Sequence, residues 1–281
     1  MKAFGRKSRL TVDTLSLDNL DLKFRIEKHL KPEPNKCDIS VINLNPEHRA
    51  QIGQWKSTDD LEDKSVAVRL EAGYEENIFQ LFLGDLRNGF TILDDEDYVT
   101  TFSAGDGEHG YKKSRINVSF GPHVSADTAL AAMAKALGVG QGNVPQVVSK
   151  LRLSGAANMF IGGATLSGSA ARHMTDFCAS ADLEWSIQDG NIQILDRGAT
   201  LGTKAVFLSD STGLIGSPRV DRKGKLNAIS LLQEDIKPGV LVEIDAPSVS
   251  GFFRVEKIVY EGDTRDDEWY VEIEAGSVKL A

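Results

Sequence analysis

The chain has 281 residues, and 32 Lys and Arg stand against 41 Asp and Glu, so the formal net charge is −9. This is an ordinary globular composition, and the length suggests two or three domains. It excludes a collagen, a coiled coil and a disordered chain. Because binding to phosphate needs clustered Lys and Arg, a pI of about 5.1 argues against a protein that coats nucleic acid.

The N-terminal ten residues carry four positive charges but no apolar stretch follows them, so we expect no signal peptide. The longest uncharged window, 153–171, is only about half apolar and holds four glycines and three serines. A membrane span needs about 20 predominantly apolar residues, so we expect a flexible surface loop here and no membrane insertion. Cys37 and Cys178 lie too far apart in sequence for a disulfide framework or a metal motif, and we expect both to be buried as small hydrophobic residues.

The first 120 residues are predicted to form strands, because apolar residues alternate over 37–41 and again over 66–70. Between these segments, Asn45-Pro46-Glu47 combines an N-cap residue, a proline at the first helical position and an acid in the first turn. This pattern predicts a short helix towards Trp55. The N-terminal part is therefore expected to be a sheet with one helix on it.

From Ser125 the apolar period becomes helical, and three helices are predicted before a hairpin at Asp189-Gly190. We therefore expect a small mixed α/β domain over 122–199. The apolar stripes of the three helices are Leu130, Met133, Ala134 and Leu137; Val144, Val147, Val148 and Leu151; and Ala171, Met174, Cys178 and Ala181. Strand patterning returns over 240–244, 253–255 and 269–275, which predicts a third, sheet-rich domain.

Two parts of the chain repeat one another in the same order. Segment 66–72 matches 240–246, and segment 95–105 matches 266–276. Segments 95–105 and 266–276 both end in Ala-Gly. Shorter matches join these: 38–40 with 228–230, 78–79 with 252–253, and Gly84-Asp85 with Gly262-Asp263. Two unrelated β-meanders would also share Val, Ile and aromatic residues. The common order of the segments and their shared Gly-Asp and Ala-Gly pairs nevertheless favour two copies of one sheet domain, over 1–121 and 200–281, with the helical domain inserted between them.

Few catalytic patterns are present. The segment 138–142 is glycine-rich but follows a helix and lacks the dinucleotide spacing, so we expect a helix C-cap and loop. No phosphate loop, nucleophile elbow or S-x-x-K pair occurs, and the five histidines are scattered. Two acidic clusters, 94–97 and 266–268, could in principle serve a glycosidase, through Asp97 or Glu268, or bind calcium. Neither has the loop spacing of a calcium site, and a charge run at the start of a strand is usually a solvated turn. We expect no catalytic, cofactor-binding or metal-binding residues, and no cofactor.

One segment, Ser125 to Arg152, has the outline of a helix-turn-helix. Its second helix carries Gln146, Lys150 and Arg152, which would make the protein a DNA binder. Against this, the would-be recognition helix offers only two cations near its end and the remaining chain is acidic. We therefore rank specific nucleic-acid binding below the alternatives.

Taken in order, the segments resemble the baseplate hub proteins of contractile phage tails, the late-control-protein-D-like group, which is related to the hub part of type VI secretion spikes. The resemblance covers nearly the whole chain. It rests on Pro34-Asn35 with 37–49, on 68–74, on 78–79 with Gly84-Asp85, on 213–218, on Pro238-Gly239, and on Gly262-Asp263 with Trp269.

The resemblance implies a mainly β fold in which two related tube-type β-barrel or sandwich domains flank a small helical domain. It implies a homotrimer whose six β domains form a pseudo-sixfold ring, with the helical insert outside the ring wall. The ring would join the hexameric tail tube, or its initiator protein, to a trimeric spike beside other baseplate proteins, and would line the DNA conduit. Such a protein is a structural part of the virion tail, assembled in the host cytoplasm, and not an enzyme; a tail-associated muralytic enzyme is the alternative.

Overall fold

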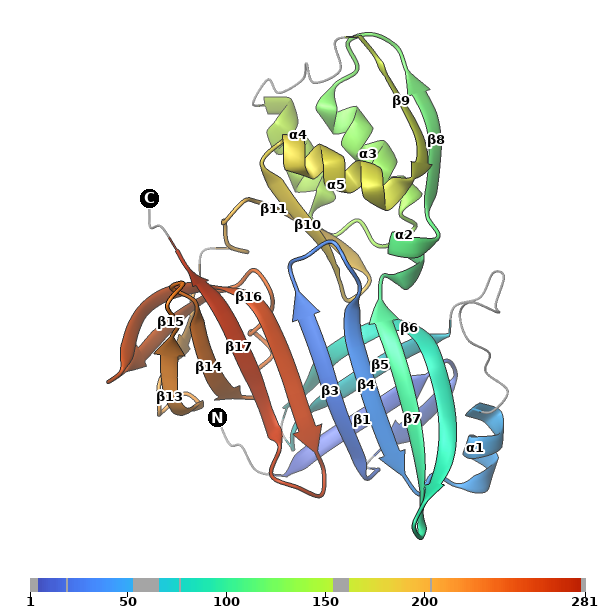
Figure 1. Cartoon of the computed structure of the whole chain (residues 1–281), viewed down its shortest axis with the longest axis vertical. Helices are drawn as coiled ribbons and strands as arrows, with labels where there is room; N and C mark the ends of the chain where they lie inside the picture. Colours follow the sequence, from blue (N-terminus) through green and yellow to red (C-terminus); the bar gives the residue numbers. More distant parts are fainter. Residues whose placement is uncertain are drawn as a thin grey trace. The chain divides into compact units, whose positions relative to one another are not determined.

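The computed structural model describes residues 5–18, 20–52, 66–75, 77–153, 162–202 and 204–278. The protein is mainly β, with 54% strand and 17% helix. It forms two compact units, the first made of 1–29, 35–105 and 198–281 and the second of 30–34 and 106–197. Figure 1 shows the strands of the first unit in blue to cyan and in orange to red, and the second unit in green to yellow. Each unit is described by itself below.

The first unit contains one sheet of 13 strands. The N-terminal half supplies β1 (Arg6–Val12), β2 (Leu15–Asp18), β3 (Leu22–His29), β4 (Asn35–Ile42), β5 (Ala67–Tyr74), β6 (Asn77–Asp94) and β7 (Asp97–Asp106), and the short helix α1 (Pro46–Ile52). The C-terminal half supplies β12 (Val206–Leu208), β13 (Leu214–Val220), β14 (Leu226–Leu231), β15 (Leu241–Ala246), β16 (Val249–Asp263) and β17 (Trp269–Ser277). The main path runs β13-β14-β17-β16-β3-β4-β7-β6-β5-β1-β2, and β15 branches from β16 to pair with β12.

Alternation of apolar and polar residues explains why these segments are strands. In β4, Cys37, Ile39 and Val41 are buried while Lys36 and Asp38 are exposed, as the sequence predicts. In β17, Val271, Ile273 and Ala275 are buried and the residues between them are partly exposed. The buried face of every strand contributes to one continuous hydrophobic core. Period-two patterning thus places one face of the sheet in the core and leaves the other face accessible.

The two halves share one strand order, which supports the predicted repeat. The path β3-β4-β7-β6-β5 of the first half corresponds to β13-β14-β17-β16-β15 of the second. The registers agree as well: Val68 lies opposite Gly84 as Val242 lies opposite Phe253, and a bulge follows Leu86 as another follows Val255. The matches of 66–72 with 240–246 and of 95–105 with 266–276 are therefore confirmed.

The three shorter matches are wrong. Gly84 occupies the place of Phe253, and Gly262 occupies the place of Leu93, so the two Gly-Asp pairs are not equivalent and 78–79 does not match 252–253. The match of 38–40 with 228–230 is displaced by one residue, because Ile39 is buried and Ile229 is exposed. Short apolar strands look alike in sequence, and one residue of slip inverts their faces.

The helix α1 is the main insertion in the first half. Its predicted N-cap is confirmed, since the amide of His48 donates to Asn45 Oδ1 over 2.8 Å. Its predicted extension to Trp55 lies outside the described residues. Gly89 of β6 takes the place of Ile258 of β16, and a Cβ at Gly89 would meet Ile52 Cγ2 at 3.4 Å. The side chain of Ile52 thus fills core space that Ile258 fills in the second half.

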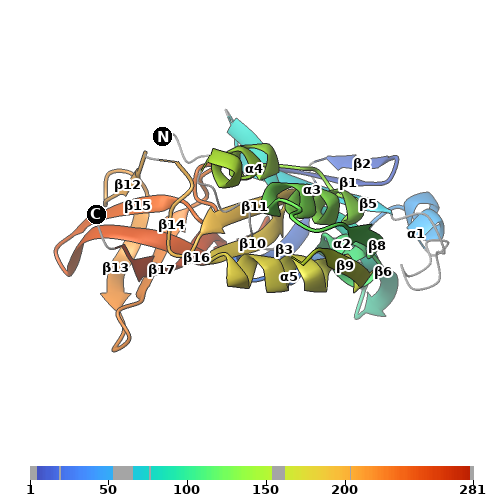
Figure 2. The same ribbon diagram turned by 90° about the horizontal axis from the view of Figure 1, so that it is seen from above.

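The second unit is a small α/β body. It contains α2 (Glu108–Lys112), β8 (Arg115–Phe120), α3 (Ala126–Ala136), α4 (Val144–Leu153), β9 (Ala164–Ser169), α5 (Ala170–Ser180), β10 (Leu183–Gln188) and β11 (Asn191–Asp196). Figure 2 shows this unit from above. The three predicted helices and the hairpin are confirmed, with the turn at Asp189 (φ 50°) and Gly190 (φ 75°) in the left-handed region that such turns require.

Two expectations for this region differ from the structure. The window 153–171 is not a loop throughout, because 164–169 form β9, which pairs with β8, and α5 begins at Ala170; residues 154–161 lie outside the described part. The sequence predicts a first domain that extends to residue 121, but 106–121 pack with the second unit, since β8 has its strand partner there. Within the described residues, no helix is long and apolar enough to cross a membrane.

Candidate assembly interface

The two halves of the first unit join through β3 and β16. These strands pair antiparallel with Phe24 opposite Gly262 and Arg25 opposite Glu261. Three ion pairs cross the junction: Lys23 with Asp263 (Nζ to Oδ2, 3.6 Å), Arg25 with Glu261, and Lys257 with Glu27 (Nζ to Oε1, 2.9 Å). We call this set the β3–β16 ion-pair ladder. Burial raises the pKa of Glu27, but the hydrogen bond and charge of Lys257 outweigh this, so its pKa lies below the ordinary value.

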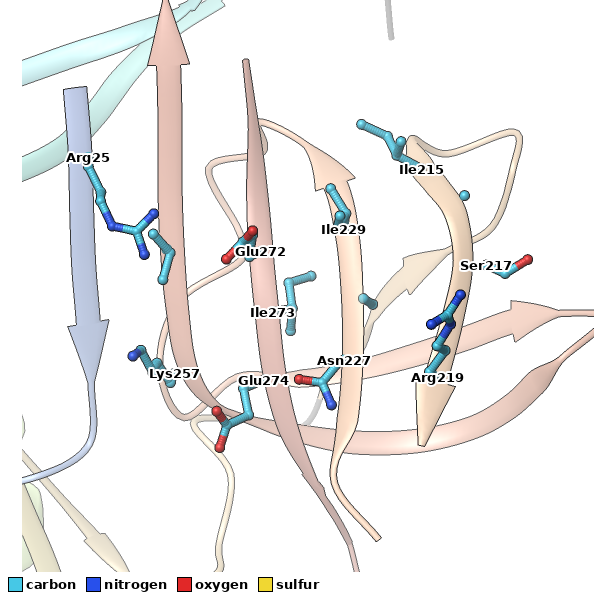
Figure 3. Close-up of a pocket in the computed structure, with 13 residues that line it drawn as sticks. Arg25, Ile215, Ser217, Arg219, Asn227, Ile229, Lys257, Glu272, Ile273 and Glu274 are labelled. Carbon is cyan, nitrogen blue, oxygen red and sulfur yellow. The ribbon is translucent and has the colours of Figure 1, made fainter. Parts of the chain in front are cut away.

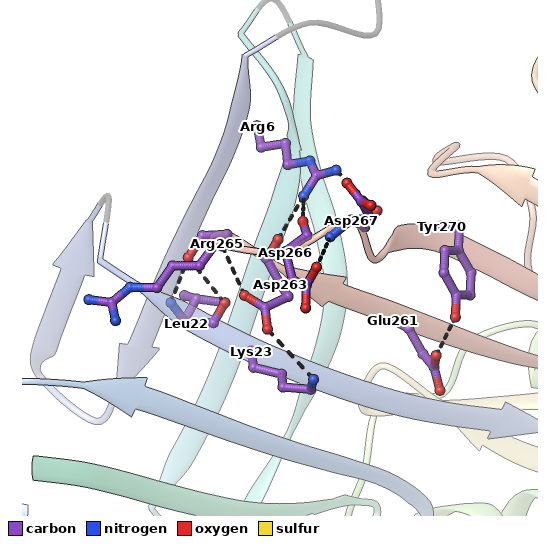
Figure 4. A network of polar contacts seen from close by, with 10 residues as sticks. Arg6, Leu22, Lys23, Glu261, Asp263, Arg265, Asp266, Asp267 and Tyr270 are labelled. Atoms are coloured by element: carbon purple, nitrogen blue, oxygen red, sulfur yellow. Dashed lines mark hydrogen bonds and ion pairs between the residues drawn. The ribbon is translucent and has the colours of Figure 1, made fainter. Parts of the chain in front are cut away.

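An aromatic contact and an arginine close the end of this junction; Figure 4 shows the arginine, Arg6, beside Asp263, Asp266 and Asp267. The ring of Phe24 meets the ring of Trp269 edge to face, with centroids 5.5 Å apart. The guanidinium of Arg6 lies over Trp269 and donates to the carbonyl oxygens of Asp263, Asp266 and Asp267 in the turn between β16 and β17. The acidic cluster 266–268 is therefore a turn that Arg6 of the other half holds in place.

Besides the terminal strands β2 and β12, two further strand edges of the same sheet lack a partner among the described strands. The strand β13 ends the sheet path, with only β14 beside it. The second part of β6, residues 88–94, pairs with β7 on one side, while the first part pairs with β5 and the amide of Leu86 donates to the carbonyl of Val66. The equivalent of β13 in the N-terminal half is β3, and the equivalent of the second part of β6 in the C-terminal half is residues 255–263 of β16. These two equivalents pair with each other. The edges of β3 and β16 are thus paired within the chain, whereas the equivalent edges of β13 and of the second part of β6 are open.

Large apolar side chains gather on these two open edges. Half of the ten exposed large hydrophobic residues in the described part lie there: Phe90 (46% exposed), Ile92 (50%), Leu93 (61%), Ile215 (40%) and Val220 (44%). Exposed hydrophobic groups scattered singly need no explanation, but groups that line an unpaired strand edge mark a surface for association.

A shallow hollow of about 550 Å³ lies on the accessible face of the C-terminal half, over β13, β14, β17, β16 and β3. Figure 3 shows its lining, in which Ile215 and Ile229 lie beside charged side chains. The charged members are Arg25, Arg219, Lys257, Glu272 and Glu274. The hollow adjoins the open edge of β13.

The residues that the sequence singled out for chemistry are not brought together as a site. Asp97 Oδ1 accepts from Asn43 Nδ2 over 2.6 Å at the β6–β7 turn, and Glu268 directly precedes β17 at the β16–β17 turn. The five histidines, His29, His48, His109, His123 and His173, lie on separate elements. In the part of the chain that the structure describes, no group of three or more His, Cys, Asp or Glu side chains could hold a metal ion.

The remaining candidates have structural roles. Lys150 of α4 forms an ion pair with Asp196, so the would-be recognition helix directs this cation to its own unit; the side chain of Arg152 lies outside the described part. Gly138 ends α3 with φ 70°, as the predicted C-cap requires. Cys37 and Cys178 are free and buried, and burial raises the pKa of both thiols, that of Cys178 to about 12.

This architecture is that of phage tail proteins. A 43 kDa tail protein of prophage MuSo2 from Shewanella oneidensis matches with a TM-score of 0.63 at 10% identity, over 96% of this chain and 97% of the other. A tail protein from Neisseria meningitidis MC58 matches with a TM-score of 0.64 at 9% identity, over 98% and 97%. An Escherichia coli component of the type VI secretion system matches with 0.56 at 12% identity, over 96% and 77%.

The family itself is shown by sequence. The profile of the family described as Baseplate hub gp41 matches residues 7–275, and the chain belongs to this family of structural phage tail baseplate proteins. No curated protein matches the chain. The resemblance inferred from ordered short motifs is therefore confirmed.

Proposed function

We propose that this hub protein is a homotrimer whose two β halves alternate around a pseudo-sixfold ring. The ring adapts a hexameric tail tube to a trimeric spike. The observation that carries the proposal is the repeat of one strand order in a single sheet, with one edge pairing satisfied inside the chain and one left open. Three chains of two copies give six equivalent positions, and a closed ring satisfies every edge.

The proposal assigns a place to each part of the chain. The β halves, 1–105 and 198–281, build the ring wall, and the insert between them, 106–197, lies outside it because its helices cannot join a sheet ladder. The ring belongs to the tail baseplate of the virion and is assembled in the host cytoplasm. Its partners are the tail tube or its initiator protein, the spike protein and other baseplate proteins.

The accessible sheet face suits the wall of a DNA conduit. Its cations Lys23, Arg25 and Lys257 each pair with a carboxylate, and the chain as a whole carries a net charge of −9. Unpaired cations would retain the phosphate backbone, whereas a neutral or acidic wall lets it pass. In a gel-shift assay at low salt we expect no retention of DNA. Tight, salt-dependent binding that Lys150→Ala and Arg152→Ala abolish would instead support the helix-turn-helix hypothesis.

The oligomeric mass tests the proposal directly. Light scattering on a sizing column should give about 92 kDa, three times the 30.6 kDa of one chain. The position in the assembled particle is the decisive measurement: a map of the tail should show three copies of this chain on the central axis between tube and spike. Any other copy number or position there refutes the proposal.

The muralytic alternative predicts a different result. The purified protein should leave peptidoglycan intact, since the carboxylate of Asp97 is engaged by Asn43 and by Arg265 of the β16–β17 turn. Clearing of a peptidoglycan suspension that disappears in Asp97→Ala or Glu268→Ala would show that the protein is an enzyme.

A further inference from the structure

The β3–β16 junction inside the chain is a template for the junction between chains. Residues 86–94 of β6 match 255–263 of β16, because both segments follow a bulge and pair with equivalent residues of β7 and β17. Thr91, opposite Thr100, thus takes the place of Tyr260, opposite Val271. Tyr260 lies opposite Ile26 of β3 across the junction.

The other side of the template is β13. The amide of Asn43 donates to the carbonyl of Tyr98 over 2.8 Å, which fixes the register of β4 against β7. Comparison with the register of β14 against β17 then makes Cys37 of β4 equivalent to Leu226 of β14. Ile26 lies opposite Cys37, and Val220 lies opposite Leu226. Val220 therefore takes the place of Ile26.

We infer that β13 of one chain pairs antiparallel with residues 88–94 of β6 in the next chain, with Val220 opposite Thr91 and Arg219 opposite Ile92. This inference rests on the proposed ring, and it names the two edges and the register that close it. Three such contacts around a threefold axis leave neither edge open.

The chemistry of this junction differs from that of its template. Asn88, Ile92 and Asp94 stand where Lys257, Glu261 and Asp263 stand in β16. On β13, Ile215 and Arg219 stand where Lys23 and Arg25 stand in β3. The ion-pair ladder of the internal junction is thus absent from these positions, and the apolar Ile92, Leu93 and Ile215 stand where Glu261, Gly262 and Lys23 stand in the template. The contact between chains is consequently apolar and resists salt, because screening weakens charge pairs but not hydrophobic burial.

The shape of β13 restricts which edge it accepts. Between Ile215 and Arg219 the strand has a register shift, and Pro218 within it has no amide hydrogen to donate. Bulges and prolines on edge strands discourage pairing with arbitrary partners. The residues on either side of the register shift keep regular pairing with β14. They can therefore still pair with a strand whose shape follows that of β13.

Engineered cysteines test the register. A chain carrying Thr91→Cys and Val220→Cys should form interchain disulfides on mild oxidation, and its trimer should run as a covalent species without reductant. Both native cysteines are buried and should not contribute. The matched control, Thr91→Cys with Asp221→Cys, moves the second sulfur to the other face of the strand and should cross-link at least tenfold more slowly. If both cysteine pairs cross-link equally, or if neither does although the protein is a trimer of about 92 kDa, the inferred register is wrong and the proposed ring is unaffected.

A second pair of variants tests the apolar character. Ile92→Lys should convert the trimer into a chain of 30.6 kDa with an unchanged circular dichroism spectrum. The control Ile78→Lys alters an exposed position (39%, against 50% for Ile92) on the part of β6 that β5 already pairs, and it should stay trimeric. The wild-type trimer should persist in about 1 M NaCl. A trimer that Ile92→Lys leaves intact, or that salt dissolves, refutes the assignment, whereas a wild-type monomer refutes the proposed ring as well.

Discussion

Gly262 is the position where the packing between the two halves can be tested most sharply. It lies opposite Phe24 in the β3–β16 register. A Cβ added there would stand 2.3 Å from Phe24 Cζ and 3.0 Å from Trp269 Cε3. Carbon atoms in contact prefer about 3.5–4.0 Å, so the ring of Phe24 or the strand must move by about an ångström. Phe24 is only 2% exposed and its ring already packs against Trp269, so little space receives it.

We therefore expect Gly262→Ala to lower the free energy of unfolding by about 1–3 kcal/mol, the usual cost of overpacking a core. For a unit of this size, each kcal/mol lowers the melting temperature by about 2–4 °C. Scanning calorimetry and urea denaturation followed by circular dichroism measure both quantities. Gly121→Ala is the control, because no atom lies within 4 Å of a Cβ at that position. It should change the free energy of unfolding by less than about 0.5 kcal/mol.

A double-mutant cycle identifies the cause. Phe24→Leu removes the ring atoms that the new methyl group would meet, so Gly262→Ala should cost at least about 0.5 kcal/mol less in that background. If Gly262→Ala is neutral, or if its cost is the same with Leu at position 24, then Phe24 does not cover the glycine and our account of the junction is wrong.

Three further outcomes are expected. Because the pKa of Glu27 is lowered in the folded protein, its pair with Lys257 stabilises the fold above the unfolded carboxyl pKa, and this contribution is lost as the pH falls through the folded pKa. The melting temperatures of wild type and Glu27→Gln should therefore converge as the pH is lowered from 7 to 3. Asp106→Ala should destabilise the second unit by about 1–3 kcal/mol in urea denaturation, since the buried carboxylate accepts from the amides of Asp189 and Gly190 over 2.6 and 2.9 Å. The thiols of Cys37 and Cys178 should react with a chromogenic disulfide at neutral pH only after unfolding, and rapid labelling of the native chain would contradict their burial.

Local patterns predicted the elements well because their causes are local. The N-cap at Asn45, the hairpin at Asp189-Gly190 and the C-cap at Gly138 each depend on a backbone conformation that a few adjacent residues determine. The period of apolar residues likewise decided helix or strand wherever a segment was amphipathic. The exception is β9, where Leu166 is the only buried residue and small polar residues hide the strand pattern.

Strand partners were much harder to predict, because pairing joins residues far apart in sequence. Lys23, Arg25 and Glu27 alternate along β3, and this alternation was visible in the sequence, but nothing in it indicated that β16 supplies their partners. The long repeats were found because their length fixed the register. The shorter ones failed, since an error of one residue leaves the composition of a strand unchanged and inverts its faces.

The same geometry can serve two junctions with different chemistry because only one of them is tethered. The halves that meet at β3 and β16 belong to one chain, so their effective concentration is high and exposed ion pairs, worth roughly 0–1 kcal/mol each, suffice to fix the register. Chains that meet at β13 and β6 must first overcome the entropy of association, which charge pairs of that strength cannot do. Burial of Phe90, Ile92 and Leu93 stabilises the contact more strongly, by about 25 cal/mol for each Å² of apolar surface removed from water. Divergence of the two copies at Asn88, Ile92 and Ile215 thus follows from covalent linkage within the chain and its absence between chains.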